Sequence, residues 1–289
     1  METSTQQKNV ANRTKRAALK RNASGDGDGD DIPVKSPYFK DLSQSEPSET
    51  DVPDAVQIPA AQSQLADKMP SAGPRLGPSF FQQPCTQLAR QLLGQVLVRV
   101  IGDQRLIGRI VETEAYLGVE DSACHTYMGR KSAANKSMFL SPGHAYVYMT
   151  YGMYHCINIT SQGEGQAVLI RGLFPLEGKY TMATLRQKAS KKSNRTFKTK
   201  DLCNGPGKLC LSLDIDRQLD GIDLTQSDSD MWVESGDHIS DGDIVSCPRI
   251  GIDSATKEWV QKPLRFYVKG NSCVSKRNKA REAEMNYST

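Results

Sequence analysis

Glu112, Glu114 and Tyr116 are the residues of this sequence whose types and spacing best suit chemistry. Side chains two positions apart in a strand lie on the same face, so a strand here would present all three together. Strict alternation also puts Ile110 on this face and Val111 on the other. A carboxylate beside an aromatic ring at a strand end suits a pocket that stacks a flat ligand and acts on it as a general base. The alternative is that both glutamates are solvated residues of an edge strand, which is the usual environment of carboxylates.

A second stretch, residues 144–160, is rich in tyrosine and reads as two strands folded about Tyr151-Gly152. A three-residue loop, 150–152, with Gly152 in the left-handed conformation pairs Tyr148 with Tyr154. This register puts the following side chains on one face: Tyr146, Tyr148, Tyr154 and Asn158. A two-residue turn would move Asn158 to the opposite face. In either register Tyr151 lies at the tip, where insertion into a base stack explains a large aromatic and an ordinary core hairpin does not.

The surrounding segments predict elements that would position these residues. A helix at 84–93 has proline in its first turn, and strands at 95–101 and 105–116 form a hairpin. The other expected elements are a buried strand at 167–173, a helix at 175–189, an acidic turn-rich stretch at 214–243 and a strand at 263–269. Together they predict a single α+β domain with a curved, mainly antiparallel β-sheet, flanking helices and a protruding β-hairpin.

Composition divides the chain into three parts: a disordered polar tail at 1–72, a folded domain at 73–275 and a flexible tail at 276–289. The net charge of +4 permits nucleic-acid binding without arguing for it. Seven cysteines without a Cys-x-x-Cys pair suggest neither a disulfide framework nor a zinc site, and no metal or organic cofactor is expected. The sequence shows no apolar run long enough to cross a membrane and no signal peptide at its N-terminus.

Several motifs, in order, resemble the alkyladenine (3-methyladenine) DNA glycosylase family of vertebrates over about residues 74–275. They are Phe80-Phe-Gln-Gln-Pro84, Leu93-Gly-Gln-Val-Leu-Val-Arg99, Glu112-Thr-Glu-Ala-Tyr-Leu-Gly118, Ala123-Cys-His125, Tyr146-Val-Tyr148, Tyr151-Gly-Met-Tyr154, Asn158-Ile, Pro175-Leu-Glu-Gly178, Leu202-Cys-Asn-Gly-Pro206 and Pro263-Leu-Arg-Phe-Tyr-Val268. The resemblance implies a monofunctional glycosylase of base excision repair. Such an enzyme flips damaged purines (3-methyladenine, 7-methylguanine, hypoxanthine, ethenoadenine) out of duplex DNA and hydrolyses the N-glycosidic bond, leaving an abasic site.

The resemblance also assigns roles within the chemistry. Glu114 would activate the attacking water, and Arg171 would orient Glu114 and that water. The flipped base would lie between Tyr116 on one side and Tyr148 with His125 on the other, with His125 also hydrogen-bonding the leaving base. For His125 the alternative is a structural histidine in a loop. Asn158 would crowd the exocyclic amine of guanine and so exclude the normal base.

DNA contacts complete the expected site. Tyr151 is the wedge that fills the vacated stack, and Met153 is placed with it as an intercalating residue. Lys208 follows Asn204-Gly-Pro-Gly at a helix start, where free N–H groups and the lysine suit a DNA phosphate. A basic run at 188–200 could face phosphates or could simply be solvated. The segments 126–129 and 131–134 depart from the more arginine-rich stretch expected in the family, so weaker contacts to the DNA backbone are expected there.

The implied partner is duplex DNA containing damaged purines, bound by a monomer, with proteins that process abasic sites acting downstream. Basic pairs at 15–16 and 20–21 are compatible with nuclear import, and the family implies the nucleus with mitochondria as a second compartment. Two other classes remain open: a non-catalytic protein that recognises lesions in the same pocket, and an enzyme that processes RNA or nucleotides.

Overall fold

Glu112, Glu114 and Tyr116 all lie on one long central strand, β2 (Gln104–Tyr116). The computed structural model describes residues 73–190 and 196–287. The disorder expected of residues 1–72 therefore lies outside the described residues, as does part of the basic run at 188–200. Within the described ranges, no helix has the length and apolarity of a bilayer span.

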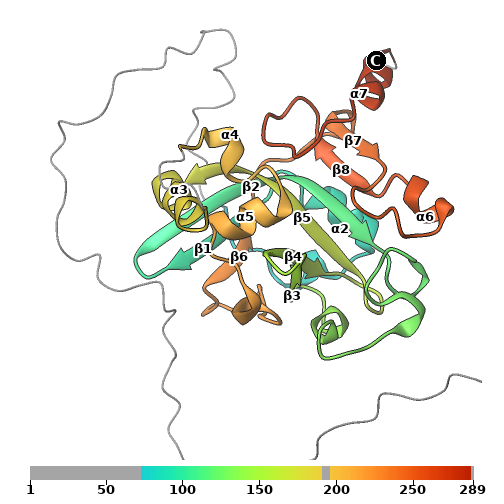
Figure 1. The fold of residues 1–289 in the computed structure, drawn as a ribbon, viewed down its shortest axis with the longest axis horizontal. Helices are drawn as coiled ribbons and strands as arrows, with labels where there is room; N and C mark the ends of the chain where they lie inside the picture. The colour runs from blue at the N-terminus through green and yellow to red at the C-terminus, as the bar shows by residue number, and fades with distance from the viewer. Residues whose placement is uncertain (1–72, 191–195, 288–289) are drawn as a thin grey trace, which may run out of the picture. The chain divides into compact units, whose positions relative to one another are not determined.

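The strands of the described residues form one sheet in which every pairing is antiparallel. They are β1 (Val96–Ile101), β2 (Gln104–Tyr116), β3 (Ala145–Thr150), β4 (Tyr154–Thr160), β5 (Ala167–Glu177), β6 (Met231–Glu234), β7 (Ile244–Cys247) and β8 (Arg265–Val268). Their order is β3-β4-β5-β2-β1-β6, and β8 pairs with the far end of β2 and with β7. The sheet curls into an antiparallel half-barrel around the long strands β2 and β5 (Figure 1).

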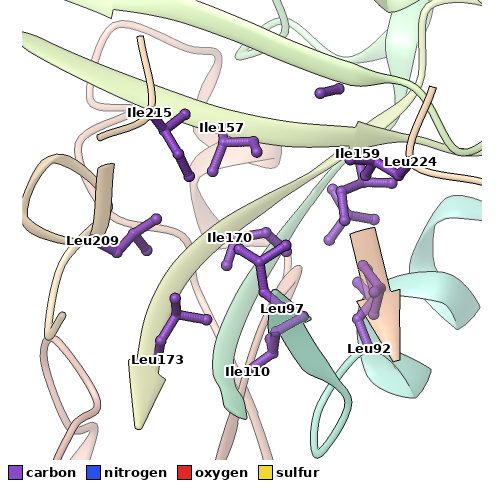
Figure 2. Packing of buried hydrophobic residues seen from close by; sticks show 14 of the residues in the cluster. Leu92, Leu97, Ile110, Ile157, Ile159, Ile170, Leu173, Leu209, Ile215 and Leu224 are labelled. Atoms are coloured by element: carbon purple, nitrogen blue, oxygen red, sulfur yellow. The ribbon is translucent and has the colours of Figure 1, made fainter. Parts of the chain in front are cut away.

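Short helices accompany the sheet. The α-helices are α1 (Pro78–Phe81), α2 (Cys85–Gln91), α3 (Lys179–Lys188), α4 (Thr199–Leu202), α5 (Pro206–Ser212), α6 (Lys257–Gln261) and α7 (Lys279–Tyr287). Helix α2 packs on β2 and β5, and α5 packs on β4 and β5. Figure 2 shows part of the resulting apolar core, to which β1 contributes Leu97, β2 contributes Ile110, β5 contributes Ile170 and α5 contributes Leu209. Burial of such side chains is the main favourable contribution to folding.

Irregular pairing between β2 and β5 turns the site residues away from this core. The register shifts between Ile110 and Glu112 and again between Glu112 and Thr113. Ile110 lies in the main core, and Thr113 is directed to the same side, where its hydroxyl donates to the Ala89 carbonyl of α2 at 2.7 Å. Val111 packs in a separate cluster with Tyr267. Strict alternation along the whole strand is therefore wrong, because an extra residue in one strand changes the face of those that follow.

Several predicted elements are confirmed, and others need correction. Helix α2 and the β1–β2 hairpin occur where expected. The strand expected to end near Arg171 continues to Glu177, so α3 starts at Lys179 rather than at 175. The acidic stretch at 214–243 contains β6, which pairs with β1. Neither β7 nor α7 was expected, and α7 is attached by Glu282, whose carboxylate accepts a 2.8 Å hydrogen bond from the Tyr267 hydroxyl.

The register of the tyrosine-rich strands also differs from the prediction. Thr150 pairs with Tyr154 and Tyr148 with Cys156, so the loop is 151–153 rather than 150–152. The shift moves each partner by two residues, which preserves the side of the sheet on which each side chain lies. Tyr146 consequently lies directly opposite Asn158, and these two residues share a face as expected.

The close approach of β2 and β5 gives a test of the fold. A Cβ on Gly108 would lie 2.9 Å from the Leu173 Cβ. We expect Gly108→Ala to reduce the free energy of unfolding by about 1–3 kcal/mol, as overpacking of a core does. A Cβ on Gly242 would have no atom within 4 Å, so Gly242→Ala is the matched control, with an effect within about 0.5 kcal/mol. Equal urea denaturation curves for the two variants would contradict the account.

Candidate functional site

Arg171 of β5 lies between the two glutamates of β2. Its Nε donates to Glu112 Oε1 at 3.1 Å, and its Nη1 donates to Glu114 Oε2 at 3.2 Å. Both carboxylates are completely buried, and Arg171 is 7% exposed. The interpretation of Glu112 and Glu114 as solvated edge residues is therefore wrong. Two buried like charges on one face require a shared cation, and Arg171 supplies it.

Glu112 is held by further partners that leave it a structural role. Arg265 of β8 donates to Glu112 Oε1 at 2.8 Å, and the Ser275 backbone N–H donates to Oε2 at 2.6 Å. Gly172 lies opposite Glu112, and a Cβ there would come within 3.0 Å of the Cys273 carbonyl oxygen. Glycine at 172 thus lets the segment leading to Ser275 approach Glu112 closely. The glutamate is fixed from three directions and in turn fixes Arg171.

Glu114 has fewer hydrogen-bond partners than Glu112, and its burial disfavours the charged form of its carboxyl. Its Oε1 accepts the Ile250 N–H at 2.8 Å, and its Oε2 accepts the Tyr116 hydroxyl at 3.0 Å as well as Arg171. Burial raises the pKa of the Glu114 carboxyl above its ordinary value, although Arg171 and the two hydrogen bonds oppose the shift. A carboxylate with a raised pKa is a better proton acceptor near neutral pH than an ordinary one.

Tyr116 is supported by a buried ion pair that sequence reasoning missed. The Arg249 guanidinium lies 4.7 Å from the centre of the Tyr116 ring. Arg249 is paired with Asp121 through both of its terminal nitrogens, and neither side chain is exposed. Asp121 also accepts the backbone N–H groups of Leu117 and Ala123, each at 3.0 Å. The pair therefore holds the Tyr116 ring and the loop that follows it as one unit.

That loop positions His125 against two tyrosines of β3. His125 Nδ1 and the Tyr146 hydroxyl are 2.8 Å apart, and the rings of His125 and Tyr148 meet edge to face at 4.6 Å. Tyr146 and Tyr148 stack on each other at 5.4 Å. Asn135 fixes the backbone of the loop by donating to the His125 carbonyl at 3.0 Å. Partial burial lowers the pKa of His125, which favours a neutral imidazole.

A cavity of about 750 Å³ adjoins this aromatic group. Its lining includes His125, Tyr148, Met149, Arg130 and Ile252. Glu114, Tyr116 and Asn158 are not among its lining residues, so the buried acid forms no part of the cavity wall.

Asn158 lies on β4 beside Tyr146. It is 4% exposed, and its Nδ2 donates to the Tyr146 carbonyl at 3.1 Å. The structure thus brings Glu114, Arg171 and Tyr116 into one hydrogen-bonded cluster. His125, Tyr148 and Asn158 gather around Tyr146. Tyr116 and Tyr148 pack against the same small apolar cluster, formed by Cys124, Met138, Tyr146 and Ala167.

The expected DNA-contacting residues lie outside this group. Tyr151 is 83% exposed and Met153 is 65% exposed in the loop between β3 and β4. Tyr151 has a φ of 52° and Gly152 a φ of 65°, so the left-handed conformation expected of the glycine is confirmed and extends to the tyrosine. Lys208 is on α5, where its ammonium donates to Asn204 Oδ1 at 2.7 Å. Helix α5 packs closely on β4 of the hairpin: a Cβ on Gly207 would lie 3.0 Å from the Tyr154 Cβ.

The residues that sequence reasoning missed have a common origin. Arg249, Ile250, Arg265 and Ser275 all reach the site from the C-terminal third of the chain, more than 120 positions after Glu114. The acidic partners of Arg249 and Arg265 are not visible in local spacing. Within the described residues, no group of three or more His, Cys, Asp or Glu side chains could hold a metal ion.

Comparison with known proteins gives consistent matches. A family model described as methylpurine-DNA glycosylase matches residues 79–272. A DNA-3-methyladenine glycosylase of Mus musculus is 53% identical over 205 residues, which are 70% of this chain and 61% of the mouse protein. One of Homo sapiens is 50% identical over 204 residues, which are 70% of this chain and 68% of the human protein. A putative 3-methyladenine DNA glycosylase of Methanocella arvoryzae is 45% identical over 206 residues, covering 71% of this chain and 97% of the archaeal protein.

The Asp121–Arg249 pair gives a test of the site's framework. We expect Asp121→Asn to reduce the free energy of unfolding by about 3–5 kcal/mol, because it leaves a buried guanidinium without its counter-charge. Asp241→Asn is the matched control, since Asp241 pairs with Arg90 at the surface and such pairs contribute about 0–1 kcal/mol. Urea unfolding of both variants measures the difference, and an Asp121→Asn loss no larger than the control would refute the role given to this pair.

Proposed function

The chain belongs to the methylpurine-DNA glycosylase family, and from this premise we propose that it hydrolyses the N-glycosidic bond of damaged purines in duplex DNA. The observation that carries the proposal is the buried Glu114, held by Arg171, Tyr116 and the Ile250 N–H beside a group of aromatic side chains. A positioned carboxylate next to stacking surfaces is what hydrolysis of a nucleoside bond requires.

The first step is extrusion of the damaged nucleotide. The target carbon is screened inside a duplex, so the base must leave the stack and a wedge must fill the gap. Tyr151 is the wedge, with Met153 beside it. Their exposure supports this role, and the left-handed backbone at Tyr151 is a strained conformation of the kind found at functional positions.

The charge of the chain segment that carries the wedge supports DNA as the substrate. Residues 122–163 contain no aspartate or glutamate and carry Arg130, Lys131 and Lys136. Six of the seven large apolar side chains that are exposed in the described residues belong to this acid-free segment, and the seventh is Tyr180. A polyanion is attracted to such a surface, and its bases can contact the apolar groups.

In the pocket the flipped base stacks between Tyr116 on one side and Tyr148 with His125 on the other. Stacking tolerates varied bases, each contact contributing about 1–3 kcal/mol. That tolerance suits substrates such as 3-methyladenine, 7-methylguanine, hypoxanthine and ethenoadenine. Alkylated purines already carry positive charge and leave readily, whereas neutral lesions need hydrogen bonds at the leaving base. His125, held neutral, supplies them.

Glu114 then activates water for attack on the sugar carbon. Among the described residues its Oε1 accepts a single hydrogen bond, from Ile250, and a carboxylate oxygen can accept two. Arg171 holds the carboxylate in place, and the negative charge of Glu114 stabilises the oxocarbenium-like transition state. Since Glu114 has no exposed surface, water reaches it only when neighbouring side chains shift as the base enters. The product is an abasic site in an otherwise intact strand.

The remaining expectations are proposals of the same kind. We propose that the protein acts as a monomer in base excision repair, with Lys208 on a DNA phosphate and abasic-site processing proteins downstream. The basic pairs at 15–16 and 20–21 support a nuclear location, with mitochondria as a second compartment.

Replacing the acid tests the mechanism. We expect Glu114→Gln to bind hypoxanthine-containing duplex DNA within a few-fold of wild type and to lose excision by at least about 10²-fold, the usual contribution of a general base. Glu120→Gln, an exposed glutamate of the following loop, is the control and should excise normally. Single-turnover assays with duplex RNA as competitor measure the excision rates of both variants.

Base release by Glu114→Gln at the wild-type rate would remove Glu114 from the mechanism. Wild-type protein that binds the lesion without releasing the base would instead be a recognition protein.

Replacing Asn158 tests selectivity. The shorter side chain of Asn158→Ser should admit the exocyclic amine of guanine, and we expect the excision of guanine-type bases relative to hypoxanthine to rise by about tenfold or more. The ratio of the two single-turnover rates is the readout, which is insensitive to a general loss of active protein. An unchanged ratio would show that Asn158 does not exclude guanine.

A further inference from the structure

Two exposed loops of this protein share one local structure. At Tyr151-Gly152 both residues have positive φ, 52° and 65°, and the same holds at Met128-Gly129, with 57° and 71°. In each pair the first residue is large, apolar and mostly exposed, 83% for Tyr151 and 74% for Met128. A Cβ on either glycine would meet no atom within 4 Å. Both loops therefore present an apolar side chain on an open, tightly turned backbone.

Met128 has no role in the folded core. It belongs to none of the apolar clusters formed by the described residues. A left-handed conformation is unfavourable for a residue with a side chain and would suit glycine better. The sequence thus keeps an exposed methionine where the backbone favours glycine and packing requires nothing. A strained backbone conformation that no packing interaction offsets is a sign of function.

The position of Met128 relative to the cavity indicates which function this is. His125 and Arg130 flank Met128 in sequence, and both line the cavity from the loop side. Tyr148 and Met149 line it from β3, three and two positions before Tyr151. The two apolar tips therefore belong to two of the chain segments that line the cavity. Both also belong to the acid-free segment 122–163, whose charge complements DNA.

We infer that Met128 is a second residue that inserts against the bases of duplex DNA, next to the nucleotide that Tyr151 displaces. The inference rests on the proposed function and extends it from one wedge to two. Methionine is one of the apolar side chains that proteins insert between base steps, and its flexibility lets it follow an irregular, opened stack. Insertion at two points stabilises the opened duplex more than a single wedge does.

The test compares Met128→Gly with Met128→Leu. Glycine removes the side chain and relieves the left-handed backbone, so the thermal midpoint of Met128→Gly should equal or exceed that of wild type. Its affinity for a hypoxanthine-containing duplex should fall about tenfold, the effect of losing the burial of one methionine side chain. Met128→Leu should restore most of the affinity. With 2-aminopurine placed beside the lesion, the fluorescence increase on binding should be smaller for Met128→Gly than for wild type.

Two controls separate insertion from other effects. Tyr180→Ala removes an exposed aromatic outside the acid-free segment and should change neither affinity nor fluorescence. Arg130→Gln should reduce the slope of log Kd against log salt by about 1 if Arg130 meets a phosphate, whereas Met128→Gly should leave the slope unchanged.

Wild-type affinity and fluorescence in Met128→Gly would overturn the inference, as would a lower thermal midpoint, which would assign Met128 a packing role. Failure of the proposed function is distinguishable. Wild-type protein that binds the duplex without releasing the base removes the glycosylase assignment, while the loss of affinity and of fluorescence in Met128→Gly still supports insertion.

Discussion

The site depends on a single guanidinium, that of Arg171, shared between two glutamates that are buried on the same face of β2. Two carboxylates so placed cannot both remain charged without a cation between them. Arg265 and Ser275 complete the coordination of Glu112, and this frees Arg171 to serve Glu114 as well. The curled sheet, the irregular β2–β5 pairing and the approach of the C-terminal segment all contribute to this arrangement. Glu112 anchors Arg171, and Glu114 is the residue that we propose activates water.

Around this rigid centre the structure separates fixed parts from exposed ones. The Asp121–Arg249 pair ties the Tyr116 ring to the loop that carries His125, so one face of the proposed base site is set by a buried ion pair. The apolar residues proposed to enter the DNA, Tyr151, Met153 and Met128, are by contrast exposed side chains of loops. This division has a physical reason. Catalysis needs a carboxylate held in place, whereas entry into a base stack needs side chains that are free to leave water.

The sequence predicts some of these features and not others. The shared face of Glu112, Glu114 and Tyr116 follows from strand alternation and persists despite the irregular pairing. The extra residue of β2 lies before Glu112, and the shift between Glu112 and Thr113 comes from an extra residue in β5. The tip position of Tyr151 survives a wrong hairpin register, because the register moved by an even number of residues. Partners contributed by β7, β8 and the segments around them could not be predicted, since nothing local links Arg249 to Asp121 or Ser275 to Glu112. Irregular strand pairing is set by long-range packing, which the hydrophobic periodicity of a single segment does not reveal. The roles assigned to the site residues stay predictions.

The pH dependence of single-turnover excision, measured for wild type and Tyr116→Phe, is the most direct test of Glu114 as the general base. Glu114 must be deprotonated to act, and burial raises its pKa, so wild-type activity should fall with decreasing pH at an apparent pKa above the ordinary glutamate value of about 4.3. Phenylalanine keeps the ring but removes the hydroxyl that donates to Glu114 Oε2 and favours its charged form. We therefore expect this acid limb to move to higher pH in Tyr116→Phe. An acid limb at the ordinary value, and at the same pH in both proteins, would contradict this expectation.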